Sequence, residues 1–331
     1  MKQHKEETVL GKILASDAAE LLGLTVQAIH KQLKSKNLPH SLSQKRTYFG
    51  HEASKEIFGL SFKKKTVCFQ IVKGGTGKTT IAHAVAICAN TLGARVLCID
   101  LDAQGNLTEA FCINANGRPV MMDIINGNST IEECLVNVAE GLDLLPSSIE
   151  NVMIDSKLMV SRVRLDAIYK DMIAGVKNNY DFIIIDCPPM LGHSVTAAAL
   201  AADIVVSPLN PDKFSEAGYK IIEEELGKIN QSFKTDIKLK FFINKFDART
   251  VLSNQTVQAL LQDDQIKEKA YTAAVRQDQQ LPNSIAQGTS VFEWTQSTNA
   301  REDIFDLTKE MLEIEIHPRK ISIKNFEKEL V

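Results

Sequence analysis

Apolar positions along most of the chain fall into short runs that alternate with longer segments of helical periodicity. The runs are rich in Val, Ile, Leu and Phe, which predicts buried strands. These predicted strands cover residues 66–72, 95–100, 142–146, 180–186, 204–209, 239–244 and 270–275. Between them, apolar helices are expected over residues 79–92, 194–202 and 214–229. Strands that alternate with helices predict an α/β fold with a doubly wound, mostly parallel sheet.

The beginning of the chain has a different pattern, which predicts two short helices and a small wing. Apolar positions within residues 16–22 predict a helix that Gly23 ends. Thr25 can cap a second helix over residues 26–34. The stretch 43–49 is expected to form a wing with a basic tip. Two short helices joined by a tight turn are typical of a helix-turn-helix.

Charge is distributed unevenly along the chain. The net charge is −3, but residues 1–65 hold twelve Lys and Arg against six Asp and Glu, which gives +6 there and −9 elsewhere. A small basic segment on an acidic body predicts a nucleic-acid-binding appendage. The candidate DNA contacts are Gln27, His30, Lys31 and Lys34 on the second helix and Lys45 and Arg46 on the wing. The alternative is a structural helical cap with a solvated basic surface.

Composition excludes several classes of protein. Hydrophobic residues make up 44% and charged residues 24% of the chain, which excludes a wholly disordered protein. No apolar run approaches the roughly 20 residues that span a bilayer, and the first residues lead into no signal core. We therefore expect a cytoplasmic protein. The six cysteines form no CxxC pair, so buried thiols are expected rather than a disulfide framework or a zinc site.

A glycine-rich loop, K-G-G-T-G-K-T-T over residues 73–80, lies between a predicted strand and a predicted helix. That context is the one a phosphate-binding loop requires. Glycines let successive backbone N–H groups point at one anion, and the helix N-terminus adds positive charge. The expected nucleotide-binding residues are Gly74, Gly75, Thr76, Gly77, Lys78, Thr79 and Thr80. Lys78 can reach the β- and γ-phosphates, Thr79 can join a Mg²⁺ shell, and Thr80 can reach the α-phosphate.

Three aspartates stand at the carboxyl ends of predicted strands, the edge at which α/β proteins bind ligands. Asp186 ends a run of four apolar residues, which is the Walker B pattern, and would hold Mg²⁺ through water. Asp100 ends the predicted strand over residues 95–100, and Asp102 follows two residues later. For Asp100 the alternative is a side chain that caps the end of its own strand.

Together these strings resemble the deviant Walker A ATPases of the ParA/MinD family. The ordinary phosphate-loop motif has a glycine where this chain has Val72, and an additional lysine, Lys73, begins the loop. D-x-D-x-Q-G-N at residues 100–106 and D-x-P-P at residues 186–189 are similar to the other nucleotide motifs of the family. The resemblance covers about residues 66–310, and it implies a P-loop NTPase fold with ATP and Mg²⁺ as cofactors.

The resemblance also implies roles for single residues. In the family the first lysine of the loop, here Lys73, crosses a dimer interface onto the nucleotide of the partner. Asp102 would position or activate the attacking water, and Asp100 would support the metal. Lys73 and Asp102 are thus the expected catalytic residues. Asn244 would contact adenine, since an amide offers both a donor and an acceptor. Arg276 would contact non-specific DNA, with a salt bridge as the alternative.

The string A-A-E-L-L-G-L-T-V-Q-A-I, residues 18–29, resembles winged, MerR-like helix-turn-helix units. A unit of this kind before the ATPase is similar to the longer ParA subclass, in which it also represses the partition operon. The expected organisation is a small winged helix-turn-helix domain at 1–60, a basic linker at 61–65, a P-loop ATPase at 66–316 and a tail at 317–331.

The function that this resemblance implies is ATP-dependent partition of plasmid or chromosomal DNA. An ATP-dependent homodimer would bind DNA without sequence preference, on the nucleoid. A ParB-like centromere-binding protein would stimulate hydrolysis that is weak without it. One alternative is a nucleotide-responsive transcriptional regulator. Another is a MinD-like membrane switch, but the thin apolar stripe of the tail favours no membrane contact.

Overall fold

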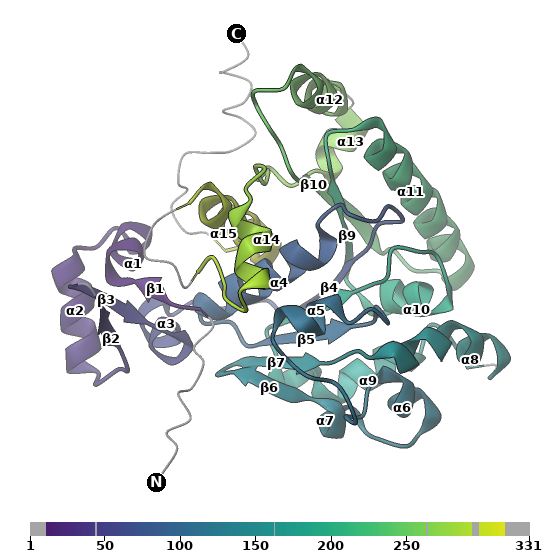
Figure 1. Cartoon of the computed structure of the whole chain (residues 1–331), viewed down its shortest axis with the longest axis horizontal. Coiled ribbons are helices and arrows are strands. Elements are labelled where there is room, and N and C mark those ends of the chain that lie inside the picture. Colours follow the sequence, from purple (N-terminus) through teal and green to yellow (C-terminus); the bar gives the residue numbers. More distant parts are fainter. Residues whose placement is uncertain (1–10, 44, 162, 263, 293–297, 315–331) are drawn as a thin grey trace.

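The computed structural model describes residues 11–43, 45–161, 163–262, 264–292 and 298–314. A seven-stranded sheet forms its centre, with the strand order β10-β9-β4-β8-β5-β7-β6 (Figure 1). The strands are β4 (Lys65–Phe69), β5 (Val96–Asp100), β6 (Val136–Ala139), β7 (Leu142–Leu145), β8 (Phe182–Asp186), β9 (Ile204–Leu209) and β10 (Lys238–Ile243). All neighbouring strands are parallel except β6 and β7. The prediction of a mostly parallel α/β sheet is confirmed.

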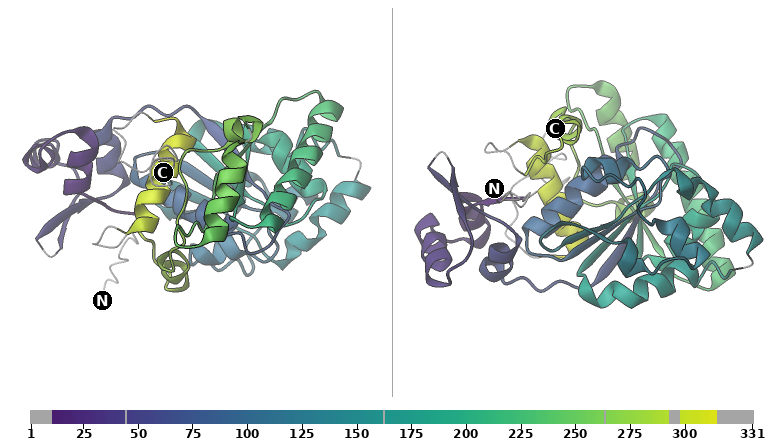
Figure 2. Two further views of the ribbon diagram at one scale, coloured as in Figure 1. Left: turned by 90° about the horizontal axis from the view of Figure 1, so that it is seen from above. Right: turned by 60° about the horizontal axis from the view of Figure 1, so that its bottom comes forward.

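Helices cover both faces of the sheet, as a doubly wound fold requires (Figure 2). Side chains along β4 alternate between two buried apolar clusters: Val67 and Phe69 belong to one, and Cys68 belongs to the other. The first cluster includes side chains of α4 (Lys78–Thr91), α5 (Asn106–Ala110), α14 (Gln280–Ala286) and α15 (Asn299–Leu312). The second includes side chains of α6 (Met121–Asn126), α7 (Ile131–Cys134), α8 (Ile154–Val160), α9 (Ile168–Val176), α10 (His193–Ala201), α11 (Lys213–Phe233) and α12 (Val251–Gln262). Three short elements, η1 (Ile149–Met153), η2 (Lys177–Asn179) and α13 (Asp264–Lys269), complete the body.

The predicted strand at residues 270–275 is wrong. The chain there follows the edge of β10 and makes only isolated bridges, at Ala270 and Arg276. The backbone N–H groups of Tyr271 and Val275 donate to carbonyls of β10 at 2.7 and 2.8 Å, while the N–H of Thr272 between them donates to the carboxylate of Glu310 at 2.7 Å. The segment thus touches β10 at separate points without forming a continuous ladder, which a pattern of apolar residues does not reveal.

The N-terminal elements form a separate lobe at one end of the sheet (Figure 1). They are β1 (Ile13–Leu14), α1 (Ala15–Leu22), α2 (Val26–Ser35), β2 (Ser41–Ser43), β3 (Arg46–Phe49) and α3 (His51–Phe58). Both predicted helices are present, and the Thr25 hydroxyl accepts a bond from the Ala28 N–H at 3.2 Å. The strands pair antiparallel in the order β1-β3-β2. Residues 11–59, called here the winged unit, thus have two helices followed by a hairpin; α3 was not predicted.

The winged unit packs on the body through α3 and the end of α4. The ring of His51 is buried and its Nδ1 lies 3.1 Å from the carbonyl oxygen of Asn90. The apolar residues of α1, α2 and α3 belong to the same buried cluster as α4 and α15. The unit therefore shares a core with the ATPase body.

The expected linker does not end where the sequence placed it. Lys65 is the first residue of β4, and its ammonium donates to the Met311 carbonyl at 2.9 Å and to the Glu313 carboxylate at 2.7 Å. Lys63 pairs with the same carboxylate at 3.1 Å. Lys65 thus fastens the chain to the end of α15, while the side chain of Lys63 stays 81% exposed.

Candidate nucleotide-binding site

The glycine-rich loop leaves the carboxyl end of β4 and leads directly into α4. Gly75 and Gly77 have φ angles of +76° and +86°, which other residues rarely adopt. At Gly77 a side chain would also collide with the Asn244 amide, which lies 2.6 Å from the position of a Cβ atom. Because α4 begins at Lys78, the loop lies at the positive end of the helix dipole.

Lys78, Thr79 and Asp186 converge below the loop. The Lys78 ammonium lies 2.5 Å from Asp186 Oδ1, and the Thr79 hydroxyl donates to Asp186 Oδ2 at 2.7 Å. Lys78 and Asp186 are both buried. Burial alone would lower the pKa of Lys78, but the attraction of Asp186 outweighs it, so this pKa lies above its ordinary value. The lysine therefore stays protonated, ready to meet an anion.

The same residues suit a magnesium ion beside a bound phosphate. Among the described residues no group of three or more His, Cys, Asp or Glu side chains could hold a metal by itself. Mg²⁺ in nucleotide sites needs less, because it usually takes one or two protein oxygens and completes its shell with phosphates and water. The hydroxyl of Thr79 and the carboxylate of Asp186 supply oxygen donors of that kind.

Asp100 and Asp102 are placed differently, although only one residue separates them. Asp100 is fully buried, and its carboxylate accepts bonds from the Thr108 N–H and hydroxyl at 2.9 and 2.8 Å. Burial, followed by the nearby charge of Asp186, raises the pKa of Asp100 to about 7. Asp100 thus caps its strand end in this structure, and metal support stays a prediction. Asp102 lines the cleft described below, where its Oδ1 accepts from the Gln104 N–H at 3.0 Å.

Lys73 lies at the rim of the loop and is held within its own chain. Its ammonium lies 2.8 and 2.9 Å from the two carboxylate oxygens of Asp212, which follows β9. Both side chains are about one-third exposed, at 31% and 30%. The expected reach of Lys73 across a dimer interface therefore requires that it first leave Asp212.

Asn244 and its neighbour Lys245 close the loop from the end of β10. The Asn244 amide donates to the Thr76 carbonyl at 2.6 Å, and the Lys245 ammonium donates to the Gly75 carbonyl at 2.7 Å. The structure thus brings Asn244 to the predicted site, in contact with the loop. Sequence analysis missed Lys245, although it stands directly beside the Asn of the matched string.

The loop residues 73–80, with Asp102, Asn244 and Lys245, line a cleft of about 900 Å³, which is the size of a small-molecule site. One wall is the loop with Asp102 and α5. The opposite wall is formed by residues 276–282 and the rest of α14, and includes Leu281 and Pro282. Sequence analysis had assigned the start of this segment to DNA contact. The position of this segment beside the cleft depends on the packing of α14 against α4. A local sequence pattern does not indicate that packing.

The assignment of Arg276 to DNA is not supported by its contacts. Its Nη2 lies 2.6 Å from Asp303 Oδ1, its Nε lies 2.9 Å from Oδ2, and Glu302 lies 3.7 Å away. Asp303 is only 3% exposed, so the guanidinium neutralises a buried carboxylate. The salt bridge that sequence analysis left as the alternative is present. The side chain also lines the nucleotide cleft.

The candidate DNA contacts of α2 lie together on one surface of the winged unit. Gln27, His30, Lys31 and Lys34 line a shallow depression along α2. On the wing, Lys45 and Arg46 are both exposed at the turn between β2 and β3. The structure therefore brings the predicted side chains of α2 to one exposed helix face, as major-groove reading requires.

An exposed apolar surface was not anticipated. It consists of Ile149, Val152, Met153, Met159, Val160 and Val163 on and beside η1 and α8, with Met190 and Leu191 from the loop after β8. Their exposures range from 38% to 76%. The other face of α8 buries Ile154 and Leu158. Exposed apolar side chains grouped on neighbouring elements in this way typically mark an interaction site. We call these eight residues the α8 patch.

The fold and the loop define a P-loop NTPase. In the described part of the chain, no helix has the length and apolar character to cross a bilayer.

A family profile described as an AAA domain matches residues 64–239. The chain is 30% identical over 254 residues to the virulence plasmid ParA family protein pGP5-D of Chlamydia psittaci, covering 75% of this chain and 94% of that protein. Soj of Bacillus subtilis, a sporulation initiation inhibitor protein, is 28% identical over 250 residues, covering 75% and 98%.

Solved structures agree on the fold. McdA of Cyanothece, solved in complex with ATP, has a TM-score of 0.69 at 19% identity and covers 78% of this chain and all of that one. A putative plasmid partition protein of Borrelia burgdorferi has a TM-score of 0.62 at 21% identity, covering 76% and 99%. The chain belongs to the ParA family and is a P-loop ATPase.

Proposed function

We propose that this ATPase partitions DNA, through an ATP-bound dimer that binds DNA without sequence preference and is released by hydrolysis. The observation that carries the proposal is the cluster of Lys78, Thr79 and Asp186 at the foot of a 900 Å³ cleft, with Lys73 on its rim. The names of relatives support it: a Treponema pallidum protein 31% identical to this chain is a chromosome-partitioning ATPase.

In this proposal the chain's own residues bind the triphosphate of ATP and orient the reaction. The loop N–H groups and Lys78 bind the phosphates, and Thr79 and Asp186 hold Mg²⁺. Bound Mg²⁺ would neutralise charge on the transferring phosphoryl group. Asp102, which lines the cleft, would orient the attacking water. Asn244, now bonded to the loop, would turn its amide to the adenine edge.

Dimerisation would complete the site. Lys73 would leave Asp212 and contact the nucleotide bound by the second copy. The loop would then supply Lys78 to its own site and Lys73 to the site of the partner. A closed dimer also needs apolar area at its interface. The α8 patch suits this role, because it adjoins the cleft through the loop that contains Pro189, Met190 and Leu191. Hydrolysis stays slow until a ParB-like partner aligns Lys73 and Asp102.

DNA would be bound in two ways. The ATP-bound dimer would contact phosphates of any sequence, which would place the protein on the nucleoid of the cytoplasm. The winged unit would read an operator through α2 and the wing, and so repress its own operon. The α2 face supports this second role, since Gln27, His30 and Lys31 share one exposed surface.

A nucleotide-responsive regulator is the second candidate, and the shared core of the winged unit and the body favours it. In that case all DNA binding would depend on the winged unit. A membrane switch would depend on the tail at 317–331, which lies outside the described residues.

The test is binding to random-sequence duplex DNA with ATP and Mg²⁺, with ADP, and without nucleotide, at two salt concentrations. We expect binding only with ATP, and a fall of at least tenfold between 50 and 200 mM salt, as phosphate contacts imply. A truncation of residues 1–59 should retain this binding, and Lys78→Ala should lose it.

Lys170→Ala is the matched control, because it removes an exposed lysine of α9 remote from the loop. Binding that ignores nucleotide and disappears with residues 1–59 would overturn the partition proposal in favour of the regulator.

A further inference from the structure

Two neighbouring residues at the end of β10 hold consecutive carbonyl groups of the phosphate loop. The Lys245 ammonium donates to the Gly75 carbonyl at 2.7 Å, and the Asn244 amide donates to the Thr76 carbonyl at 2.6 Å. Both side chains line the nucleotide cleft. The proposed function gives a role to Asn244 alone, so it leaves the contact of Lys245 with the loop without a function.

These two bonds fix the direction of the N–H groups beside them. No peptide bond among the described residues is cis, and in a trans peptide unit the C=O and N–H groups point in opposite directions. The Gly75 carbonyl shares its unit with the Thr76 N–H, and the Thr76 carbonyl shares its unit with the Gly77 N–H. With both carbonyls held by the end of β10, both N–H groups face away from it. Successive N–H groups are what such a loop offers to a phosphate.

Lys245 is the residue that can keep this arrangement once a nucleotide is bound. In the proposed complex Asn244 turns its amide to adenine, and the Thr76 carbonyl loses its donor. The side chain of Lys245 reaches Gly75 across the face of Gly77, where its Cε would lie 3.8 Å from a Cβ atom, an ordinary packing distance. One residue would thus read the base while its neighbour holds the loop.

The backbone at Lys245 is strained. Its φ is +54°, a left-handed conformation that glycine adopts freely and that costs energy for a residue with a Cβ atom. Hydrogen bonds hold the chain on either side, from the Asn244 N–H to the Leu209 carbonyl at 2.8 Å and from the Phe246 N–H to the Val275 carbonyl at 3.0 Å. A strained residue that carries a side chain into a site is typical of a functional role.

We infer that Lys245 is a positioning residue of the ATPase, which holds the peptide unit between Gly75 and Thr76 ready for the phosphates of ATP. The inference rests on the proposed binding of the triphosphate by the loop. A loop that is already oriented loses little conformational freedom when the nucleotide binds, so more of its interaction with phosphate appears as affinity. Lys245 acts through the loop and needs no contact with the nucleotide.

Binding of a fluorescent ATP analogue with Mg²⁺ to the full chain is the first test. Lys245→Met removes the ammonium but keeps the length of the apolar stem. It should weaken binding about tenfold, the effect of losing one hydrogen bond from a charged group. Lys245→Arg should retain most of the affinity, because a guanidinium can also donate to the carbonyl.

Lys245→Gly separates this role from a contribution to folding. It removes the contact with the loop and also relieves the strain at φ +54°. It should therefore bind the analogue as weakly as Lys245→Met but unfold at a higher urea concentration than Lys245→Met. A merely structural role would make affinity and stability change together.

A nuclear magnetic resonance signal reports on the loop itself. The nitrogen of the Thr76 amide belongs to the peptide unit that Lys245 holds, so its ¹⁵N chemical shift responds to the hydrogen bond at the Gly75 carbonyl. In nucleotide-free protein labelled with ¹⁵N-threonine, this signal should move upfield in Lys245→Met and stay near its wild-type position in Lys245→Arg.

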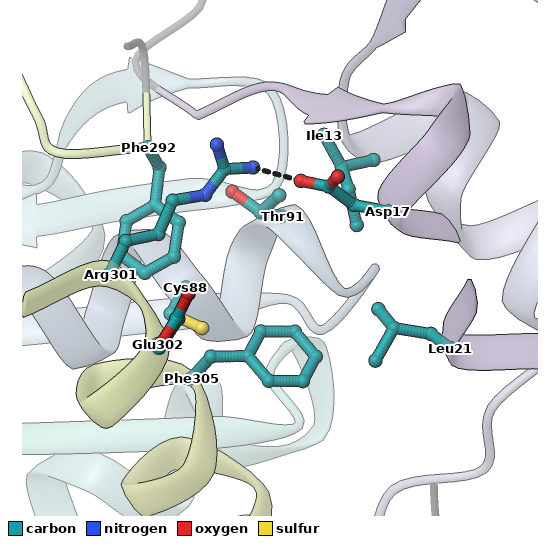
Figure 3. Close-up of a pocket in the computed structure, with 9 residues that line it drawn as sticks. All are labelled: Ile13, Asp17, Leu21, Cys88, Thr91, Phe292, Arg301, Glu302 and Phe305. Atoms are coloured by element: carbon teal, nitrogen blue, oxygen red, sulfur yellow. Dashed lines mark hydrogen bonds and ion pairs between the residues drawn. The ribbon is translucent and has the colours of Figure 1, made fainter. Parts of the chain in front are cut away.

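Two variants serve as controls. Lys238→Met removes an exposed lysine from the other end of β10 and should bind the analogue as wild type. Asp17→Asn weakens a largely buried ion pair remote from the loop, in which Arg301 Nη2 lies 2.9 Å from Asp17 Oδ2 in the pocket between α1 and α15 (Figure 3). It should lower the urea midpoint and leave nucleotide binding unchanged.

The outcomes distinguish the two levels of the argument. Wild-type affinity in Lys245→Met overturns the positioning role and leaves the ATPase proposal intact. Weakened binding with an unchanged Thr76 signal also overturns it, because Lys245 would then act on the nucleotide directly. Wild-type protein that binds no ATP analogue overturns both.

Discussion

Single residues of the nucleotide site are already paired inside the chain. Lys78 holds Asp186 and Lys73 holds Asp212, so no strong charge of the loop is left without a counter-charge. Removing one partner of a buried ion pair costs about 3–5 kcal/mol, so Lys78→Ala should also lower the stability of the apo protein. When a nucleotide binds, its phosphates therefore compete with Asp186 and Asp212 for the two lysines, rather than meeting unpaired charges.

His83 of α4 gives a prediction at the same scale. The ring is 2% exposed, contacts the ring of Phe111 in a tilted arrangement and has a pKa that burial lowers to about 4. Below pH 6.5 the unfolded chain therefore takes up a proton that the folded chain refuses until about pH 4. The free energy of unfolding should therefore decrease as the pH is lowered from 6.5 to about 4. Between pH 7 and 5, wild type should lose about 2 kcal/mol more than His83→Leu, measured by urea unfolding.

His40→Gln serves as the control for this measurement, because His40 lies on the exposed surface of the winged unit. Its pH dependence should match that of wild type. Equal losses in wild type and His83→Leu would show that the buried ring does not set the acid sensitivity.

At the scale of elements, the junction of α3 and α4 depends on Gly93. This residue has a φ of +96°, and a Cβ atom would lie 2.8 Å from the Lys55 Cα. Gly93→Ala combines backbone strain with a collision against a helix backbone, so we expect a loss of about 3 kcal/mol in the free energy of unfolding. Urea unfolding of the full chain measures it.

Gly23→Ala is the matched comparison. Its φ is +64°, but no atom lies within 4 Å of the added Cβ. Only the backbone term remains, and the expected loss is about 1 kcal/mol. If both variants lose a similar free energy of unfolding, α3 can move away from the added methyl group at Gly93 without a measurable loss of stability.

At the scale of the whole molecule, the α8 patch should decide how two copies associate. Met159 is 65% exposed, and Met159→Glu would place a charge on the patch. We expect the ATP-dependent dimer to weaken at least tenfold, because an unpaired charge in an interface must be desolvated. Nucleotide binding by each copy should be unchanged. Sedimentation with a non-hydrolysable ATP analogue measures the dimer.

Leu42→Glu provides the comparison, since Leu42 is 73% exposed on the wing and lies outside the patch. This variant should dimerise as wild type. A dimer that tolerates Met159→Glu would place the interface elsewhere on the body.

The sequence by itself determined six of the seven strands of the sheet and the phosphate loop, but it missed β6 and added a strand at residues 270–275. Strands β5 and β8 are continuous apolar runs up to the aspartate that ends each of them, and such runs are a local property of the chain. The loop also needs only local information, since glycines, a lysine and a threonine between a strand and a helix already define it. Carboxylates at strand ends were predicted to lie near it for the same reason. Parallel strands bring their carboxyl ends to one edge.

Only the tertiary structure decided which charges meet. Lys73 and Asp212 are 139 residues apart in sequence, and Arg301 and Asp17 are 284 residues apart. From the sequence Arg276 was predicted to be a surface cation that contacts DNA, whereas in the folded chain it pairs with Asp303 of α15. An ion pair depends on a few ångströms of separation and on burial, because Coulomb attraction falls with distance and is screened by water. Packing of distant segments sets both quantities, and no pattern within one segment records them.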